Sequence, residues 1–337
     1  MINSEEINKI LSDSSPQLTE DLARQAAALT QQYFGRTISL YAPLYLSNYC
    51  TGGCLYCGFN QNHSVQRIKL NPEQIEAEML TLAAMGIKNI LLLTGESYDL
   101  TPVEYLCKAV CLGRKYFSQV GLEIHPLETS EYSALYLAGA DSLTVYQETY
   151  DRTRYAEVHL HGRKRDYDFR YGAAGRASAA HFRQISLGIL LGLSKVANDL
   201  ASLYNHLRYM ERQYPGVEYS LSFPRLRRIK GENFIPDVIN DQTFMRIIAL
   251  SRILFPRVGI NLSTREQPDL RDRLLGIGVT KISAGSKTTV GGYHAPAEQR
   301  DPQFDVQDSR SVEAVIRRVK KLGFDPVITD WRAITNE

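Results

Sequence analysis

The chain has few cysteines, little net charge and no long apolar run. Only five of its 337 residues are cysteines, and 39 Lys and Arg stand against 37 Asp and Glu. No apolar run approaches the ~20 residues that a membrane-spanning helix needs. So small a net charge argues against nucleic acid or a membrane surface as a partner. An odd set of cysteines, with none after Cys111, does not fit the disulfide framework of an exported protein. We therefore expect a cytoplasmic protein.

What the sequence does contain is a regular alternation of short apolar runs and helical patterns. The apolar runs predict eight strands, at 37–47, 89–95, 121–126, 141–148, 184–190, 217–223, 258–263 and 280–286. Helix-period patterns separate them, and glycines mark several joints between helix and strand. This rhythm predicts an α/β fold, a (β/α)8 barrel of the TIM type. A doubly wound open sheet is the alternative.

The barrel pattern is flanked by helical segments. We expect an N-terminal helical segment at 1–35, with Ser15 as its main helix cap and Gly35 at its end. The barrel is expected at 36–310, and a C-terminal helix with a tail that packs on it at 311–337. A charged, aromatic stretch from Tyr150 to Tyr171 is predicted as a long loop. Such loops in compact domains are usually functional or mobile.

Three of the five cysteines lie in the stretch "LYLSNYCTGGCLYCGFNQ". They are Cys50, Cys54 and Cys57, and they follow the first predicted strand. In a β/α barrel the active site lies at the carboxyl ends of the strands. The other predicted strands also end in polar residues, so the cysteines share that rim with them.

The spacing of the three cysteines leaves several kinds of site open. A structural zinc ion takes four ligands, and His63 is the nearest candidate for a fourth. Cys107 and Cys111 lie four residues apart on a predicted helix, where we expect them to pack in the core. A redox pair is a further alternative. Three thiolates on a four-iron cluster would leave one iron without a protein ligand, and an open position is where chemistry occurs.

The CxxxCxxC pattern, with Tyr56 just before its third cysteine, resembles that of the radical S-adenosylmethionine (SAM) superfamily. Further stretches resemble the tyrosine lyases of that superfamily, the 2-iminoacetate synthase (ThiH) family, in order from about residue 35 to 331. They include "PLYLSNYC", "LLLTGE", "LTVYQETY", "SFPRLR", "NLSTRE", "SAGSKT", "QFDVQDSRSVE" and the "DW" pair near the C-terminus. The same core is similar to HydG, a tyrosine lyase that supplies carbon monoxide and cyanide for hydrogenase assembly.

The resemblance implies a [4Fe–4S] cluster and SAM as cofactors. It places Cys50, Cys54 and Cys57 on the cluster, with the remaining iron open to SAM. Tyr56 would lie near the adenine, and Phe59 would offer aromatic surface beside the cluster. The other residues expected to bind SAM are Thr94, Gly95 and Glu96 for its amino group, and Glu148 and Arg170 for its ribose and carboxylate.

The substrate carboxylate is expected at the end of the seventh predicted strand. The resemblance places Ser263, Thr264 and Arg265 there, and a forked guanidinium suits a planar carboxylate. Ordinary ion pairs are the alternative for both arginines: Arg265 with Glu266 or Asp269, and Arg170 with Asp166 or Asp168.

The activity implied by the resemblance is cleavage of the Cα–Cβ bond of L-tyrosine to 2-iminoacetate (dehydroglycine) and p-cresol. SAM would become 5′-deoxyadenosine and methionine, and the product would enter the thiazole branch of thiamin biosynthesis. The implied partners are the thiazole synthase ThiG and an electron donor such as flavodoxin or ferredoxin. A HydG-like function is disfavoured because no cysteine follows Cys111 to hold a second cluster. Lysis of another aromatic amino acid and a non-catalytic iron–sulfur carrier stay open, and no residue is assigned to the phenol hydroxyl.

Overall fold

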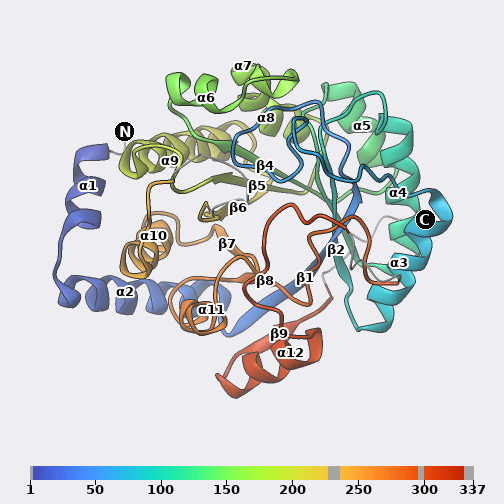
Figure 1. The fold of residues 1–337 in the computed structure, drawn as a ribbon. Helices are drawn as coiled ribbons and strands as arrows, with labels where there is room; N and C mark the ends of the chain where they lie inside the picture. The colour runs from blue at the N-terminus through green and yellow to red at the C-terminus, as the bar shows by residue number, and fades with distance from the viewer. Residues whose placement is uncertain (1–2, 227–235, 295–299, 330–337) are drawn as a thin grey trace.

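Eight parallel strands form a closed barrel. The computed structural model describes residues 3–226, 236–294 and 300–329. Strands pair in chain order, and β1 pairs with both β2 and β8, which closes the ring (Figure 1). The predicted (β/α)8 barrel is confirmed and the open sheet is wrong. The strands are β1 Thr37–Ser47, β2 Asn89–Thr94, β3 Gln119–Glu123, β4 Ser142–Glu148, β5 Gln184–Ile189, β6 Glu218–Ser222, β7 Gly259–Leu262 and β8 Lys281–Ser283.

Helices surround the barrel because each of its first seven strands is followed by a helix with buried residues on one side. Asn71 and Gln74, for example, form a capping box that begins the first of them. Among the described residues no helix is long and apolar enough to cross a membrane. The outer helices are α3 Pro72–Ala84, α4 Val103–Tyr116, α5 Thr129–Leu137, α8 Ala173–Ala179, α9 Val196–Gln213, α10 Asp241–Leu254 and α11 Pro268–Leu275.

The N-terminal segment contains two helices, α1 (Ser4–Ser12) and α2 (Pro16–Phe34). The Ser15 side chain caps α2 by accepting a hydrogen bond from the amide of Leu18, as the sequence predicts. Gly35 ends α2 with a φ of 62°, a left-handed conformation that favours glycine. Helix α1 packs against α9 and α2 against α10, so both lie on the outside of the barrel (Figure 1).

The C-terminal helix α12 (Val312–Lys321) is followed by a strand that was not predicted, β9 (Asp325–Val327). It runs parallel to the first residues of β1, at 37–39. A three-residue strand has no periodicity that would reveal it in a sequence. The "DW" pair and the rest of the expected tail lie outside the described residues.

The stretch predicted as a long loop, Tyr150 to Tyr171, is largely helical instead. It forms α6 (Arg152–Val158), a turn of 3-10 helix (Arg163–Arg165) and α7 (Tyr167–Tyr171). Each α-helix starts at an aspartate, Asp151 or Asp166, whose side chain accepts a hydrogen bond from a backbone amide of the first turn. The prediction was wrong because helices of one or two turns are too short to show an apolar stripe.

Candidate active site

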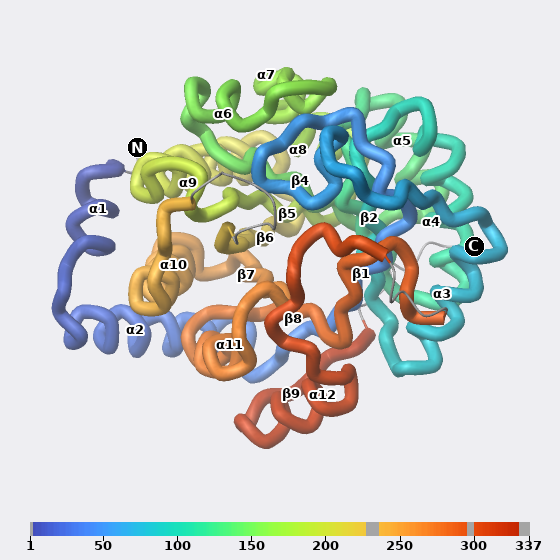
Figure 2. The backbone as a smooth tube through the Cα atoms, in the orientation of Figure 1, coloured from blue at the N-terminus to red at the C-terminus, as the bar shows by residue number. Residues whose placement is uncertain are grey.

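The loop after β1 that contains the cysteines is held between two other segments at the carboxyl end of the barrel. On one side Leu55 N donates to Val158 O over 3.1 Å and Leu160 N donates to Gly53 O over 3.3 Å, which makes a short antiparallel bridge. On the other side the amide of Gly58 donates to the carbonyl of Gln303 over 3.2 Å. In Figure 2 this blue loop accordingly lies between the green α6–α7 segment and the red segment beyond β8.

The sulfur atoms of this loop gather around its glycines. The Gly52 amide donates to Cys50 Sγ over 3.3 Å, and a Cβ at Gly52 would lie 3.6 Å from Cys54 Sγ. Burial raises the pKa of Cys54 to about 12 and also raises that of Cys57. In the described ranges no three His, Cys, Asp or Glu side chains converge on a position for one metal ion. A [4Fe–4S] cluster takes each thiolate on a different iron, so it does not need that convergence.

The end of β2 lies directly beneath the cysteine loop. The backbone amide and hydroxyl of Thr51 donate to the carbonyl of Glu96 over 2.8 and 3.1 Å. A Cβ at Gly95 would overlap the carbonyl oxygen of Tyr49 and lie 3.1 Å from Cys50 Cβ. Position 95 therefore admits only glycine at this distance, and it places Thr94 and Glu96 next to the first cysteine.

Several buried polar atoms at the ends of the barrel strands have no partner within the described structure. They are Thr94 Oγ1, Glu96 Oε1, Gln147 Nε2 and both ring nitrogens of His125. These residues lie at the ends of β2, β3 and β4, which are neighbours in the barrel. A buried polar atom without a hydrogen bond costs about 1–3 kcal/mol, so native proteins rarely keep a group of them unsatisfied. The oxygens of Thr94 and Glu96, which flank Gly95 beside the cysteine loop, fit a polar ligand such as SAM next to a cluster on the three cysteines.

Glu148 at the end of β4 is the centre of a buried ionic group. Lys164 Nζ lies 2.6 Å from Glu148 Oε1, and a terminal nitrogen of Arg170 lies 3.5 Å from the same oxygen. Although burial raises the pKa of Glu148, the charges of Lys164 and Arg170 hold it below its ordinary value. Glu148 also has a φ of 70°, a strained conformation for a non-glycine residue, and such strain is common at functional sites.

In the α6–α7 segment, Arg170 does not form the ion pair with Asp168 that the sequence offers as an alternative to SAM binding. Asp168 binds Arg152 on the surface, while Arg170 donates through Nε to the carbonyl of Tyr146 over 2.6 Å and reaches Glu148. The suggested pairing of Arg170 with Asp168 is therefore wrong. Asp166 uses its side chain to cap α7.

Tyr56 is fixed by a hydrogen bond from the cysteine loop to α6. Its hydroxyl lies 2.6 Å from His159 Nε2, and His159 Nδ1 lies 2.7 Å from the carbonyl of Tyr155. Burial lowers the pKa of His159 to about 3, so the ring is neutral at physiological pH. Its Nδ1–H donates to the carbonyl, and Nε2 accepts from Tyr56. The aromatic ring of Tyr56 is thereby held at the mouth of the barrel.

A cavity extends from the cysteine loop into the barrel. Of the predicted site residues, Tyr56, Cys57, Glu148, Ser263, Thr264 and Arg265 line it. Cys50 and Cys54 lie in the same loop, and Thr94, Gly95, Glu96 and Arg170 lie just outside the cavity lining. Phe59 does not reach it: the side chain is buried against Tyr45, with ring centroids 5.8 Å apart, and belongs to the hydrophobic core.

Arg265 lies in the cavity wall at the end of β7. Its guanidinium carbon lies 3.6 Å from the ring centroid of Phe304, a cation–π arrangement that fixes the side chain. Burial lowers the pKa of Arg265, and nearby tyrosines and carboxylates oppose that shift. Glu266, one of its two suggested partners, binds Arg225 Nε over 3.0 Å.

The sequence predictions did not include three residues of the site. Lys164 lies in the stretch predicted as a loop, and Gln303 accepts from the Tyr45 hydroxyl over 2.7 Å and approaches Cys57 Sγ at 3.9 Å. Glu123 lines the cavity from β3. Its only sequence signal is a carboxylate inside an apolar strand.

The remaining two cysteines lie on α4, as predicted, away from the cavity. Cys107 is partly buried, but Cys111 is exposed. The prediction that both pack in the core is therefore wrong for Cys111. The two positions lie on one side of the helix, but the apolar face of α4 is centred on other residues, Leu106, Ala109 and Val110.

Comparison with known proteins agrees with the geometry. Residues 44–207 match the radical SAM superfamily, and residues 222–325 match the biotin and thiamin synthesis associated domain. The chain is 36% identical to the 2-iminoacetate synthase of Escherichia coli over 98% of its own length and 88% of that protein's.

Solved structures give the same result. The crystal structure of HydG from Carboxydothermus hydrogenoformans has a TM-score of 0.90 and 31% identity, and the match covers 97% of this chain and 76% of that one. A second HydG crystal structure, a maturase of the [FeFe]-hydrogenase, has a TM-score of 0.90, 32% identity and coverage of 97% and 73%. The chain therefore belongs to the radical SAM superfamily and, within it, to the family of the 2-iminoacetate synthases.

Proposed function

We propose that this protein is a 2-iminoacetate synthase, which cleaves the Cα–Cβ bond of L-tyrosine to 2-iminoacetate and p-cresol. The observation that carries the proposal is the 36% identity to the Escherichia coli enzyme over nearly the whole chain. The geometry supports it, because the three-cysteine loop covers one end of a cavity that has an arginine in its wall. Thiazole synthase ThiG, a flavodoxin or ferredoxin donor, and a cytoplasmic location are part of the same proposal.

The roles of the chain's own residues follow from their positions. Cys50, Cys54 and Cys57 would hold the cluster, which together with SAM supplies radical hydrogen abstraction when bound. Thr94 and Glu96 each offer a buried oxygen that has no partner among the described residues, as a SAM ammonium needs. Other proposed contacts are Tyr56 with the adenine, Glu148 and Arg170 with the ribose and carboxylate, and Ser263, Thr264 and Arg265 with the tyrosine carboxylate.

The buried pair of Lys164 and Glu148 bears on how SAM binds. Both side chains are largely buried and their charged atoms are 2.6 Å apart, so Glu148 is kept ionised and oriented. An ionised carboxylate can accept hydrogen bonds from vicinal hydroxyls. The walls of the cavity hold tyrosine close to SAM and keep water out, which is the protein's main contribution to radical chemistry.

The decisive experiment is product analysis with the anaerobically reconstituted protein. Given tyrosine, SAM and a reductant, it should form p-cresol and 5′-deoxyadenosine in step, both detected by mass spectrometry. Formation of 5′-deoxyadenosine without p-cresol would contradict tyrosine lysis and retain the superfamily chemistry. A cluster whose electron paramagnetic resonance spectrum does not respond to SAM would favour an iron–sulfur carrier.

A HydG-like activity is the second candidate, because the HydG structures match with a TM-score of 0.90. About a quarter of each HydG chain has no counterpart here, since the match covers 73% and 76% of their lengths. The two activities differ in their products. Cyanide and carbon monoxide in the same assay would favour the HydG-like activity, and 2-iminoacetate with its hydrolysis product would favour the synthase.

A further inference from the structure

Glu123 is a carboxylate inside the barrel that has no place in cofactor binding. It ends β3, pairs in register with Leu93 of β2 and lines the cavity with Tyr146. Within the described residues its carboxylate has no hydrogen-bond or ion-pair partner. Glu123 is half-buried in the cavity wall, and a carboxylate that is partly removed from bulk water is more stable when it meets a donor, so this position favours one.

The hydroxyls of Tyr45 and Tyr146, which line the cavity, do not supply that donor. The Tyr45 hydroxyl donates to Gln303 Oε1 over 2.7 Å, and the Tyr146 hydroxyl donates to Ser222 Oγ over 3.2 Å. Burial and the charge of Glu148 raise the pKa of Glu123 to about 7, and the charge of Arg265 opposes them. Neither tyrosine hydroxyl therefore donates to the Glu123 carboxylate.

Glu123 and Arg265 face the cavity from opposite walls. Arg265 follows β7 and Glu123 ends β3, and these strands are four positions apart in either direction around the ring of eight. Aromatic residues line the space between them, namely Tyr45, Tyr146 and Phe304. The cavity thus offers a cation, an apolar aromatic wall and a carboxylate acceptor. These three groups are complementary to a ligand that has a carboxylate for the cation, an aromatic ring for the wall, and a hydroxyl donor at the far end of the ring for the acceptor.

We propose that Glu123 is a specificity residue that accepts a hydrogen bond from the phenol hydroxyl of tyrosine while Arg265 binds the substrate carboxylate. The inference rests on the proposed function and adds the group that recognises the phenol. A site with a buried acceptor rejects an analogue that lacks the donor, because the acceptor is then left unpaired. Phenylalanine is that analogue.

The test is the affinity of tyrosine and of phenylalanine for the reconstituted, SAM-loaded protein, measured by calorimetry without reductant. The unaltered protein should prefer tyrosine by about 10- to 100-fold, as expected for a hydrogen bond to a charged group. Glu123→Ala should lose that preference through weaker tyrosine binding, with phenylalanine affinity unchanged. Glu123→Gln keeps a neutral acceptor of the same shape and should lose only about fivefold. Glu73→Ala, which removes an exposed carboxylate on α3, is the matched control and should behave as the unaltered protein.

Two results would overturn the inference. One is a tyrosine preference that survives in both Glu123 variants, and the other is an equal loss of affinity for both amino acids. If Glu123→Ala does not take up the cluster, an undiminished preference in Glu123→Gln still contradicts the inference. The proposed function is tested separately, since it requires p-cresol from the unaltered protein. If the unaltered protein makes p-cresol and the Glu123 variants keep its tyrosine preference, this inference is refuted and the proposed function is not.

Discussion

At the scale of single residues, three cysteine thiols and three glutamate carboxylates determine the chemistry of the cavity and its mouth. Each carboxylate has a different environment. Glu148 is ionised by Lys164 and Arg170, Glu96 has a buried oxygen without a partner among the described residues, and Glu123 faces the cavity. Environment rather than residue type therefore separates their roles, as it does wherever several carboxylates share one site.

Arg265 should contribute to the affinity for tyrosine and not to the affinity for SAM. Arg265→Ala removes the forked cation that we place on the substrate carboxylate, so tyrosine affinity should fall by about 10- to 100-fold. SAM affinity should change by less than about twofold, a difference too small to be a lost hydrogen bond to a charged group. Calorimetry on the reconstituted protein measures both constants. Arg257→Ala, at an exposed arginine, is the control. An equal loss of both ligands in Arg265→Ala would show that this residue supports the cavity as a whole.

At the scale of elements, the cysteine loop depends on α6 and on the turn that follows it. The bridge between Gly53 and Leu160 and the hydrogen bond from Tyr56 to His159 join these segments. In the structure a Cβ at Gly53 would lie 2.6 Å from His161 Cδ2 and 3.1 Å from the backbone nitrogen of His161. The glycine therefore lets the two backbones approach.

Gly53→Ala should reduce cluster uptake without unfolding the protein. The added methyl group would push the cysteine loop away from the turn after α6, because the backbone nitrogen of His161 cannot swing aside as a side chain could. We expect iron and sulfide content after reconstitution to fall several-fold, with little change in far-ultraviolet circular dichroism. Gly216→Ala is the matched control, since a Cβ there meets nothing within 4 Å. Full cluster content in Gly53→Ala would mean that the loop tolerates displacement from α6.

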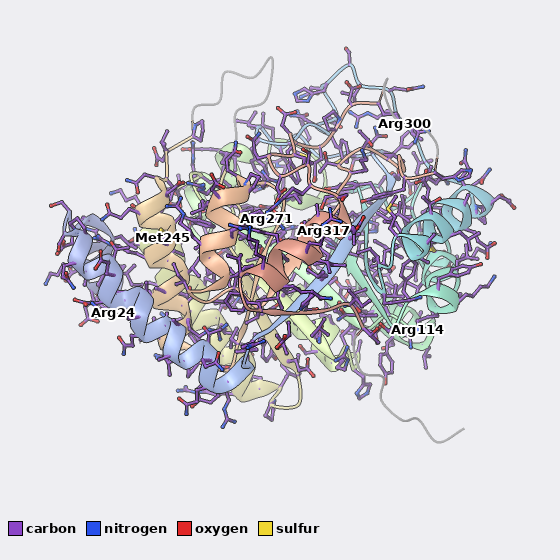
Figure 3. All side chains as sticks on the ribbon, turned by 90° about the horizontal axis from the view of Figure 1, so that it is seen from below. Arg24, Arg114, Met245, Arg271, Arg300 and Arg317 are labelled. Carbon is purple, nitrogen blue, oxygen red and sulfur yellow. The ribbon has the colours of Figure 1, made fainter. Side chains whose placement is uncertain are left out.

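At the scale of the whole molecule, Arg246 attaches the N-terminal helices to the barrel. It lies on α10, follows in the chain the Met245 that Figure 3 labels, and is 1% exposed. Its guanidinium donates to the carbonyls of Ile10, Asp13 and Ser15 and to the Thr19 hydroxyl, all in α1, α2 or the turn between them. One side chain therefore satisfies the backbone groups at the junction of two helices.

Arg246→Ala should destabilise the protein by about 2–4 kcal/mol, because three partly buried carbonyls and the buried Thr19 hydroxyl lose the charged donor that they share. Denaturant unfolding followed by circular dichroism measures the free energy of unfolding. Arg24→Ala, on α2 and labelled in Figure 3, is the control. Its salt bridge with Asp21 is largely exposed, so its loss should cost less than about 1 kcal/mol. An Arg246→Ala protein as stable as the control would show that the helices are attached by apolar packing alone.

The sequence by itself determined the eight strands, the order of strands and helices, and the position of the three cysteines. These features are local: apolar runs, helix-period patterns and the spacing of Cys50, Cys54 and Cys57 can be read within short windows. Where the pattern was too short, as in α6, α7 and β9, the prediction failed.

Only the tertiary structure decided which distant residues meet. Lys164 binds Glu148, Gln303 approaches Cys57, and Glu123 faces Arg265 across the cavity because the barrel closes and brings β3 opposite β7. Phe59 lies in the core and not at the cavity because Tyr45 packs against it. These partners come from different strands and loops. The barrel closes, and its loops pack over one rim, only when the whole chain folds, so no short window of sequence contains this information.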